Sequence, residues 1–455
     1  MGDFIEIRGK EFVRDEKPVL FKGLGIGSWL NIEHFMVGIP CTESQMRDSF
    51  AAVYGEATAK RFFESFADNF VTEADFTYLK KLGINLLRVP FNYRLFLEDE
   101  KPDSFREEGF RRLDRLLAFG KKYQIYILPD LHAVPGGQNP DWHSDNSTGY
   151  TQFWHYGVFR RQMAKLWGKI AERYCEEEYL LGYDLLNEPC VFSDRSSDAE
   201  TALIQEFYEE ATEEIRKYDQ NHLLFLEGDH FAMEFDCLHE LKDEKTALMF
   251  HYYPAVWDPD LYRKDYEPDK RRVAFERVFT SLLEIRERFG RPVLCGEAGY
   301  ETDWENPEFT EMLLRETVRL CGKYRVSFTL WSYKDARFMG LIYPKADSPW
   351  MKLSAEFGKT WDHDEDARRG EKAVNAFCDV YYPEATAEER YMLSFRQRAI
   401  LYSLQKKHLL EKILREHSGE EMLRLPKSFR YENCEHFEEY EKLLREFCFE
   451  TEEKA

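Results

Sequence analysis

The stretch Leu180–Glu188, LLGYDLLNE, decides the fold of this chain. Most of it is apolar, as in a strand that is buried on both faces of a sheet. The stretch ends in Asn187 and Glu188, and the next residue is Pro189, which has no N–H group to continue sheet pairing. Apolar strands of this kind, with polar residues at the end, recur along the chain, and their repetition predicts the architecture.

Seven further apolar runs resemble this one, and helical patterns with apolar residues three or four positions apart lie between most of them. The runs cover residues 20–27, 84–91, 125–132, 222–228, 247–253, 292–299 and 327–333, and the helical patterns cover 57–81, 108–122, 155–176, 198–217, 270–289 and 308–323. Eight strands that alternate with helices predict a parallel sheet closed into a (β/α)8 TIM barrel, an α/β fold. An open doubly wound sheet is the alternative, but the glycines of GLGIG (23–27) lack the spacing of a phosphate-binding turn.

The two ends of the chain differ from this pattern. Residues 4–22 predict an N-terminal hairpin, and residues 384–450 contain two strongly amphipathic helical stretches without a Gly/Ser/Pro linker before them. We therefore expect a catalytic barrel over residues 1–383 and a helical C-terminal appendage over 384–455. The appendage is expected to pack outside the barrel or against another subunit, which makes a homo-oligomer possible through the C-terminal helices.

Composition excludes several classes of partner. The formal net charge of −22 disfavours nucleic acids and anionic membranes, because phosphates would be repelled. No apolar run approaches the roughly 20 residues of a membrane span, and the first residues lack the pattern of a secretory signal. Nine cysteines without paired spacing are typical of reduced thiols, so a cytoplasmic location is expected.

Polar and aromatic residues gather at the ends of the predicted strands. These are Arg88, His132, Asn187, Glu188, His251, Tyr253, Glu297 and Trp331. In a barrel of this type the carboxyl ends of the strands surround the active site. Glu188 ends the fourth run and Glu297 the seventh, so the two carboxylates are expected to face each other across the barrel mouth. Cleavage of a glycosidic bond needs two such groups, and a separation of roughly 5–5.5 Å predicts a retaining route.

Several motifs together resemble a known family. LLGYDLLNEP (180–189) resembles the Asn-Glu-Pro signature of family-5 glycoside hydrolases, the cellulase-like barrel enzymes, and PVLCGEAG (292–299) resembles their nucleophile strand. Further similar motifs follow the same order, namely NLLRVPF, LPDLH with PGGQN, FHYY and LWSYKD. The resemblance covers about residues 4–340. It implies that Glu188 is the general acid/base and Glu297 the nucleophile.

The same resemblance implies roles for the other residues at the rim. Asn187 would hold the 2-hydroxyl of the sugar in the −1 subsite, and Tyr253 would donate a hydrogen bond to the nucleophile. His132 and His251 would line the subsite, with Trp331 as a platform under the sugar ring. Arg88 is expected to keep Glu297 ionised, whereas Glu188 is expected to keep a raised pKa and to stay protonated.

Two long polar loops are expected to close one end of the cleft. They are GSWLNIEHF (27–35) and PGGQNPDWHSDNSTGY (135–150), and their candidate substrate-binding residues are Asn31, Gln138, Asn139 and Trp142, together with Trp29 and Glu33. Closed sites favour attack at chain ends or on short oligosaccharides. This loop pattern resembles the exo-acting branches of the family more than the open-groove cellulases.

We therefore predict a retaining β-glycosidase that hydrolyses short β-linked oligosaccharides, of β-mannosidase or β-glucosidase type, without metal or cofactor. An endo-β-1,4-glucanase or mannanase is the main alternative, and a transglycosylase would use the same covalent intermediate. A non-catalytic sugar-binding barrel is disfavoured because both glutamates are present. A metalloenzyme that uses His132, His143 and His251 is disfavoured because no HExxH-type spacing occurs.

Overall fold

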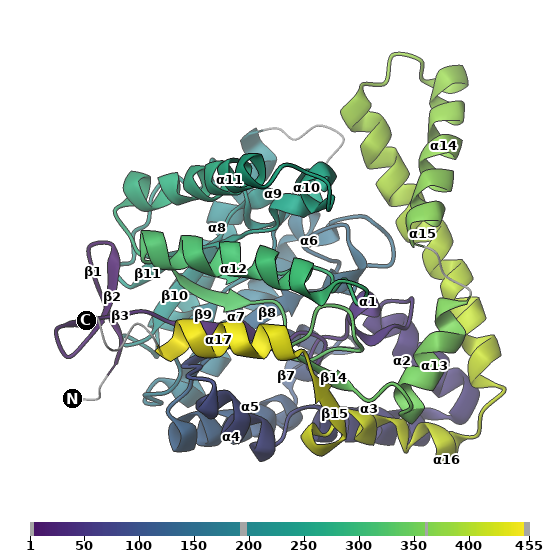
Figure 1. Cartoon of the computed structure of the whole chain (residues 1–455), viewed down its shortest axis with the longest axis horizontal. Coiled ribbons are helices and arrows are strands. Elements are labelled where there is room, and N and C mark those ends of the chain that lie inside the picture. The colour runs from purple at the N-terminus through teal and green to yellow at the C-terminus, as the bar shows by residue number, and fades with distance from the viewer. Residues whose placement is uncertain (1–3, 192–197, 360–362, 450–455) are drawn as a thin grey trace.

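Eight parallel strands form a closed barrel in the computed structural model, which describes residues 4–191, 198–359 and 363–449 (Figure 1). In chain order the barrel strands are β4 (Lys22–Gly25), β5 (Leu86–Asn92), β8 (Tyr126–Ala133), β9 (Gly182–Asp184), β10 (Leu223–Glu227), β11 (Thr246–His251), β12 (Val293–Glu297) and β13 (Ser327–Leu330). Each strand coincides with one of the apolar runs described above, and β5, β8 and β11 extend one residue beyond theirs. The predicted (β/α)8 barrel is confirmed.

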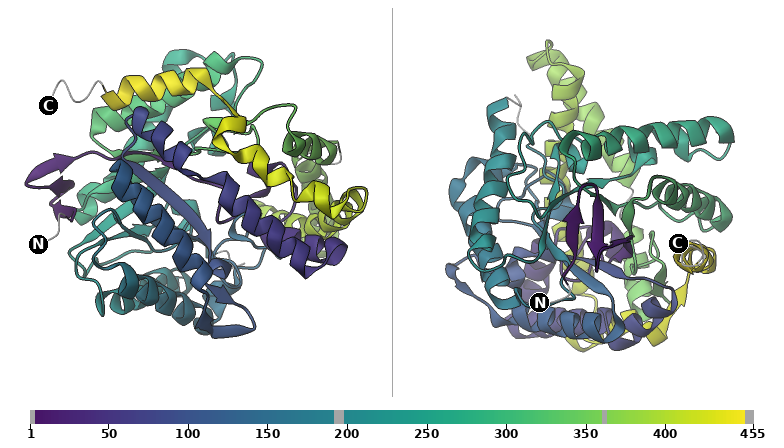
Figure 2. Two further views of the ribbon diagram at one scale, coloured as in Figure 1. Left: turned by 90° about the horizontal axis from the view of Figure 1, so that it is seen from below. Right: turned by 90° about the vertical axis from the view of Figure 1, so that its left-hand side faces the viewer.

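Helices surround the barrel and bury the outward-facing side chains of the strands (Figure 2). The helices that precede the last barrel strand are α1 (His34–Val37), α2 (Glu43–Tyr54), α3 (Glu56–Phe70), α4 (Glu73–Lys81), α5 (Glu107–Tyr123), α6 (Gln152–His155), α7 (Gly157–Tyr174), α8 (Asp198–Arg216), α9 (Asp229–Ala232), α10 (Pro254–Trp257), α11 (Pro268–Phe289) and α12 (Pro307–Tyr324). The helix expected over 57–81 is divided into α3 and α4. The division follows from Thr72, whose reciprocal side-chain and backbone hydrogen bonds with Asp75 begin a new helix.

The N-terminal end of the barrel is closed by a small antiparallel sheet. It has three strands, β1 (Glu6–Arg8), β2 (Glu11–Arg14) and β3 (Lys17–Val19), so the expected hairpin lacked one strand. Phe12 of this sheet packs against Phe21 and Phe225 inside the barrel. Because this end is plugged, the carboxyl ends of the strands are left to form the site.

The loops on the other end carry short elements of their own. These are η1 (Tyr93–Leu95), the hairpin of β6 (Leu97–Glu98) and β7 (Lys101–Phe105), η2 (Trp142–Ser144), η3 (Pro259–Tyr262), β14 (Ile342–Pro344) and α13 (Pro349–Gly358). The segments that follow β4 and β13 therefore contain helices as well as loops.

The C-terminal part of the chain returns to the barrel. It comprises α14 (His363–Tyr381), α15 (Ala387–Leu414), α16 (Gly419–Met422), η4 (Leu425–Phe429), η5 (Tyr431–Asn433), β15 (Cys434–His436) and α17 (Glu438–Phe449). Helices α14 and α15 form a hairpin that projects from the barrel, and α17 lies beside α12 (Figure 1). The proposed domain boundary at residues 383 and 384 falls between α14 and α15, which contact each other, and the division stays a prediction.

Helix α17 occupies the place of the eighth outer helix, between α12 and α4. Glu446 of α17 pairs with Arg315 of α12 at 2.8 Å, and Glu441 accepts a 2.7 Å hydrogen bond from the Tyr78 hydroxyl of α4. Lys22, at the start of the first barrel strand, donates to the carbonyl groups of Phe447 and Cys448 at the end of α17. The last helix of the chain thus completes the ring around the barrel. Among the described residues, no helix combines the length and apolarity that crossing a membrane requires.

Candidate active site

Arg88 of β5 organises the floor of the barrel mouth. Its guanidinium is fully buried and pairs with four carboxylates, at 2.6 Å (Glu297), 2.7 Å (Asp184), 3.0 Å (Glu227) and 3.1 Å (Asp130). Burial alone would lower the pKa of Arg88, but the carboxylates, Asp130 foremost, hold it well above its ordinary value. Arg88 is therefore a fixed positive charge to which strands β5, β8, β9, β10 and β12 all connect.

Glu297 is the last residue of β12, and both of its carboxylate oxygens are engaged. Oε1 accepts from Arg88 Nη1 at 2.6 Å, and Oε2 accepts from the Tyr253 hydroxyl at 2.8 Å. The Nδ1 atom of His251 lies 3.6 Å from the same Oε2 atom. These charge-assisted and hydroxyl hydrogen bonds fix the orientation of the carboxylate, as a nucleophile requires.

The sequence placed Glu188 at the end of its strand, but in the structure Glu188 lies beyond the strand. Strand β9 ends at Asp184, and the chain continues along its neighbours through two single hydrogen bonds. The Leu185 N–H donates to the Phe225 carbonyl at 3.2 Å, and the Asn187 N–H donates to the Leu131 carbonyl at 3.0 Å. These hydrogen bonds extend the barrel wall beyond β9 as far as Asn187, next to Glu188.

The backbone of Glu188 is held in a left-handed conformation. Its φ of 45° costs a non-glycine residue about 1 kcal/mol. The Glu188 N–H donates to the Glu227 carboxylate at 2.6 Å, and the Glu188 carbonyl accepts from Asn139 Nδ2 at 3.0 Å. These two braces hold the strained turn, so the direction of the Glu188 side chain depends on them as well as on Pro189.

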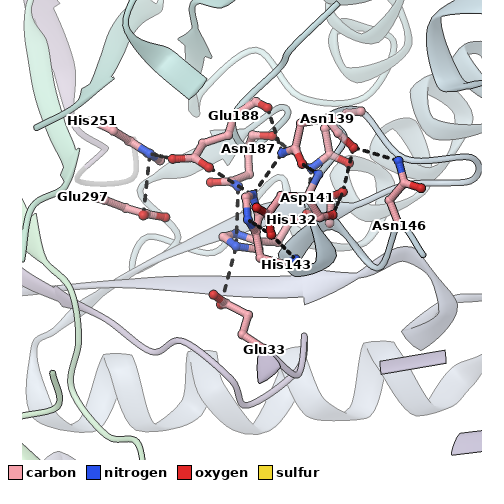
Figure 3. A network of polar contacts seen from close by, with 12 residues as sticks. Glu33, His132, Asn139, Asp141, His143, Asn146, Asn187, Glu188, His251 and Glu297 are labelled. Atoms are coloured by element: carbon pink, nitrogen blue, oxygen red, sulfur yellow. Dashed lines mark hydrogen bonds and ion pairs between the residues drawn. The ribbon is translucent and has the colours of Figure 1, made fainter. Parts of the chain in front are cut away.

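Two histidines contact the Glu188 carboxylate from opposite sides (Figure 3). His251 Nδ1 lies 2.7 Å from Oε1, and His143 Nε2 lies 3.0 Å from Oε2. The other ring nitrogen of His143 lies 3.3 Å from Asp141. Burial raises the pKa of Glu188, but the two histidines outweigh it and hold this pKa below its ordinary value.

The expectation that Glu188 stays protonated in the free protein is therefore wrong. It treated the carboxyl group as poorly compensated, whereas His143 and His251 compensate it. Burial works against the charged form of both rings, yet the facing carboxylates raise the pKa of His143 and that of His251 well above their ordinary values. In the free site these shifts favour protonated histidines beside an ionised Glu188.

The two glutamates are close together. An oxygen of Glu188, an oxygen of Glu297 and a ring nitrogen of His251 all lie within 4.8 Å of one another. Carboxyl groups of inverting enzymes are roughly 6.5–9.5 Å apart, to leave room for a water molecule, so this pair belongs to the shorter, retaining class. The same three atoms have the spacing of a metal site. Arg88 and Tyr253 each donate one hydrogen bond to Glu297, which leaves lone pairs on its oxygens free for nucleophilic chemistry.

Trp331 follows β13 and forms one wall of the mouth. Its ring is parallel to that of His132, with 5.7 Å between the centroids and 3° between the planes. A Cβ atom at either Gly25 or Gly27 would lie 2.5 Å from the Trp331 ring. Gly25 and Gly27 thus make room for this tryptophan. His132 is oriented by a 2.7 Å contact of its Nδ1 with Asp130.

The predicted loop residues mostly hold other parts of the site. Gln138 donates to the carbonyl groups of His132 at 2.8 Å and Asn187 at 3.0 Å, and Asn31 donates to the His143 carbonyl at 2.9 Å. The side chains of Asn31, Gln138 and Asn139 are fully buried. Their hydrogen bonds fix the backbone of the mouth from beneath its surface. This favours a role in positioning other residues of the site over direct contact with a ligand.

The two tryptophans of these loops do not share the positioning role of Asn31, Gln138 and Asn139. The ring of Trp142 packs against that of His34, with 5.0 Å between the centroids. Trp29 is buried, and its indole N–H donates to the Ala67 carbonyl at 2.8 Å. Trp29 therefore serves loop packing, and Glu33 of the same loop reaches the mouth.

Sequence reasoning missed five charged residues of the site. They are Asp130, Asp141, His143, Asp184 and Glu227; His143 was considered only as a metal ligand. Glu227 ends the apolar run HLLFLEG just as Glu297 ends PVLCGE, so the same rule would have found it. Asp130 and Asp184 interrupt apolar runs, where a buried carboxylate requires a cationic partner such as Arg88. His143 and Asp141 lie in an irregular loop that carries no such signal.

Comparisons with known proteins agree with this geometry. The family model described as Cellulase (glycosyl hydrolase family 5) matches residues 52–337. A β-xylosidase of Phanerodontia chrysosporium is 32% identical over 97% of both chains. Endoglucanase C of Acetivibrio thermocellus is 24% identical over 61% of this chain and 88% of its own. A glucan 1,3-β-glucosidase of Lachancea kluyveri is 27% identical over 41% of this chain and 45% of its own.

Solved structures show the same fold at lower identity. Thermotoga maritima Cel5A in complex with mannotriose is 18% identical, with a TM-score of 0.52 over 71% of this chain and 92% of its own. An endogalactoceramidase is 17% identical, with a TM-score of 0.57 over 78% of each chain. These likenesses concern the fold alone.

Proposed function

The chain belongs to glycosyl hydrolase family 5, and from this premise we propose that it is an exo-acting, retaining β-glycosidase of short β-linked oligosaccharides. The observation that carries the proposal is the pair of carboxylates within 4.8 Å of each other, Glu188 beside two histidines and Glu297 beside Arg88. Glu188 can exchange protons with its histidines, and Glu297 is held in a fixed orientation by Arg88 and Tyr253. A double displacement needs this division of roles.

In the first step Glu297 attacks the anomeric carbon of the sugar in the −1 subsite. The bond from C1 to the glycosidic oxygen breaks as the bond from C1 to the Glu297 carboxylate forms, and Glu188 delivers a proton to the departing oxygen. The hydrogen bonds from Tyr253 and Arg88 hold Glu297 in line for this attack. Asn187, beside Arg88 and His132, is proposed to hold the 2-hydroxyl.

Glu188 needs its proton only when the leaving group departs. In the free site that proton lies on the histidine pair, and His143 Nε2 is 3.0 Å from the Glu188 carboxylate, within reach for a direct transfer. A sugar that fills the mouth excludes water and weakens the charge-separated form, so the proton moves to Glu188. In the second step Glu188 takes a proton from water, which attacks C1 and releases Glu297.

The sugar accepted at the −1 subsite is the open part of the proposal. A β-glucoside and a β-mannoside remain the candidates that the sequence suggested. The relative that matches along 97% of both chains is named a β-xylosidase, which adds a β-xyloside as a third candidate. The endoglucanase relative covers 61% of this chain, so the match that includes the C-terminal helices is the one with the exo-type name.

A substrate screen tests the proposal. Aryl β-glucoside, β-mannoside and β-xyloside are compared with reduced oligosaccharides and with an insoluble β-1,4-glucan and mannan. We expect release of the aryl group from at least one monoglycoside and shortening of oligosaccharides by single sugars. Activity on the polymers with none on any monoglycoside would establish the endo-acting alternative. Absence of turnover on every substrate would favour a sugar-binding barrel.

The cellular setting is proposed on separate grounds. All nine cysteines are unpaired thiols, as in proteins of reducing compartments, which supports a cytoplasmic location. Helices α14 and α15 expose several large apolar side chains, among them Phe377, Tyr381 and Tyr391, which supports self-association through this hairpin. Sedimentation velocity over a dilution series tests self-association, because a dimer should dissociate on dilution. The Tyr381→Ser variant should dissociate at a higher protein concentration than the wild type.

A further inference from the structure

Glu33 is a third carboxylate at the barrel mouth, and the proposed reaction does not use it. Its side chain is 2% exposed, yet its Oε1 atom has no hydrogen-bond partner among the described residues. Glu33 stands at the N-cap position of α1 but makes no side-chain capping bond there. The nearest group that can carry positive charge in the described chain is His132, whose Nε2 lies 3.6 Å away.

The position of Glu33 is firmly built. Its backbone N–H donates to the Ser28 hydroxyl at 3.2 Å, and the preceding Ile32 N–H donates to the Glu43 carboxylate at 2.8 Å. A buried carboxylate without a partner costs free energy of folding. Burial, together with the charges of Glu297 and Glu188, raises the pKa of Glu33, although His143 works in the opposite direction. A side chain held in place at such a cost implies a partner that arrives with the substrate.

A chain of contacts relates Glu33 to the reacting atoms, and Figure 3 shows its part from Asn187 through His132 to Glu33. Arg88 donates a hydrogen bond to Glu297, which is proposed to bond to C1, and another to the Asn187 side chain at 2.8 Å. Asn187, proposed to hold the 2-hydroxyl, lies 3.4 Å from His132 Nε2, and Glu33 lies 3.6 Å beyond that atom. If C1 of the sugar lies at Glu297 and its 2-hydroxyl at Asn187, the ring continues in the direction of Glu33. The 3- and 4-hydroxyls are then the groups that would meet Glu33.

We propose that Glu33 binds the 3- and 4-hydroxyl groups of the sugar in the −1 subsite and thereby selects a free non-reducing end. A carboxyl group that meets two adjacent hydroxyls can form a hydrogen bond with each of them. The proposal rests on the glycosidase function given above and deepens it, because it assigns the exo preference to one residue.

The chemistry of the oligosaccharide explains the selection. Within a β-1,4- or β-1,3-linked chain, every internal sugar has one of these oxygens in a glycosidic bond, so it lacks that hydroxyl and carries another ring there. An internal sugar would leave Glu33 buried without its partner and would press a second ring against the loop. Only the sugar at the non-reducing end offers both hydroxyls.

The test combines variants of Glu33 with deoxygenated substrates. The full-length wild-type protein, Glu33→Gln and Glu33→Ala are assayed on the best aryl β-monoglycoside and on its 3-deoxy and 4-deoxy analogues. Loss of the carboxylate, or of the hydroxyl that it binds, should each lower kcat/KM by about 100-fold. Both changes together should cost little more than one, because they remove the same interaction. Glu56→Gln, the same change at an exposed position of α3, is the control and should match the wild type.

A measurement of stability separates binding from folding. A purely structural Glu33 predicts that Glu33→Gln lowers the melting temperature, whereas a ligand-binding Glu33 predicts an unchanged or higher melting temperature with lower kcat/KM. If the wild type is active but the losses in kcat/KM from the Glu33 substitution and from the missing hydroxyl are fully additive, the assignment of Glu33 is overturned while the glycosidase proposal stands. A wild-type protein inactive on every aryl monoglycoside would overturn the glycosidase proposal and this inference with it.

Discussion

The Nε2 atom of His143 lies 3.0 Å from the Glu188 carboxylate, and the opposite edge of the same ring lies 3.3 Å from Asp141. Asp141 is part-exposed, so this contact joins the proposed acid/base to a group near solvent. Glu188 and His143 therefore titrate as a pair that shares a proton. The pair loses this proton only at a pH well above the ordinary pKa of histidine, because facing carboxylates raise the pKa of His143.

Removal of His143 should narrow the active pH range from its basic side. In His143→Gln the proton has to stay on Glu188 itself, and His251 at 2.7 Å still favours the ionised carboxylate. The basic limb of kcat/KM should thus move to lower pH. Profiles of the variant and of His155→Gln, an exposed control, test this. A basic limb that stays in place or moves upward would show that His143 does not hold the proton.

Chemical rescue should assign the two glutamates. Glu188→Ala should lose about 10²–10⁴-fold in rate on substrates with poor leaving groups and should be reactivated by azide on an activated aryl glycoside, with a β-glycosyl azide as product. Glu297→Ala should instead yield the α-azide, because azide then attacks C1 from the vacated side. Product configuration is read by NMR. The opposite pairing of variants and products would reverse the roles.

The glycines beneath Trp331 should be intolerant of a methyl group. In Gly25→Ala the new Cβ would lie 2.5 Å from the Trp331 ring, which must shift from its place beside His132. Overpacking of this kind costs about 1–3 kcal/mol of stability, and the displaced platform should raise KM. Gly322→Ala on α12 meets no atom within 4 Å and is the matched control. Equal KM values for the two variants would remove Trp331 from the substrate site.

Helix α17 should be required for a stable barrel. Leu444 is fully buried on it, so Leu444→Ala should lower the free energy of unfolding by about 2–5 kcal/mol. Leu404→Ala on α15, where the side chain is 62% exposed, should change it little. Urea denaturation measures both. Equal effects would mean that α17 is an appendage and not part of the barrel layer.

The sequence predicted the barrel and most residues at its mouth, for a physical reason. Strands buried on both faces must be apolar along their length, so a polar residue at the end of such a run stands out, as Arg88, His251 and Glu297 do. The protonation of Glu188 escaped prediction because its partner His143 comes from a loop without periodicity. The role of α17 escaped because an amphipathic pattern shows that a helix has a buried face but not what covers it.

Glu33 illustrates the same limit in the loop after the first strand. Its sequence context, WLNIEHF, placed it among several candidates for the cleft wall. Only the structure separates the members of that loop. Trp29 and Asn31 each donate a side-chain hydrogen bond to a protein carbonyl. Within the described chain the Oδ1 atom of Asn31 and the Oε1 atom of Glu33 accept none, and of these two side chains only that of Glu33 can carry charge.

The central claim is that Glu297 forms a covalent bond to the anomeric carbon. A 2-deoxy-2-fluoro β-glycoside with an activated leaving group slows the second step more than the first, so the glycosyl-enzyme accumulates. Peptide mapping by mass spectrometry then locates the sugar. We predict one sugar per chain, on the peptide that contains Glu297. A label on the peptide of Glu188 or Glu33, or complete turnover of the reagent without a label, would contradict the account.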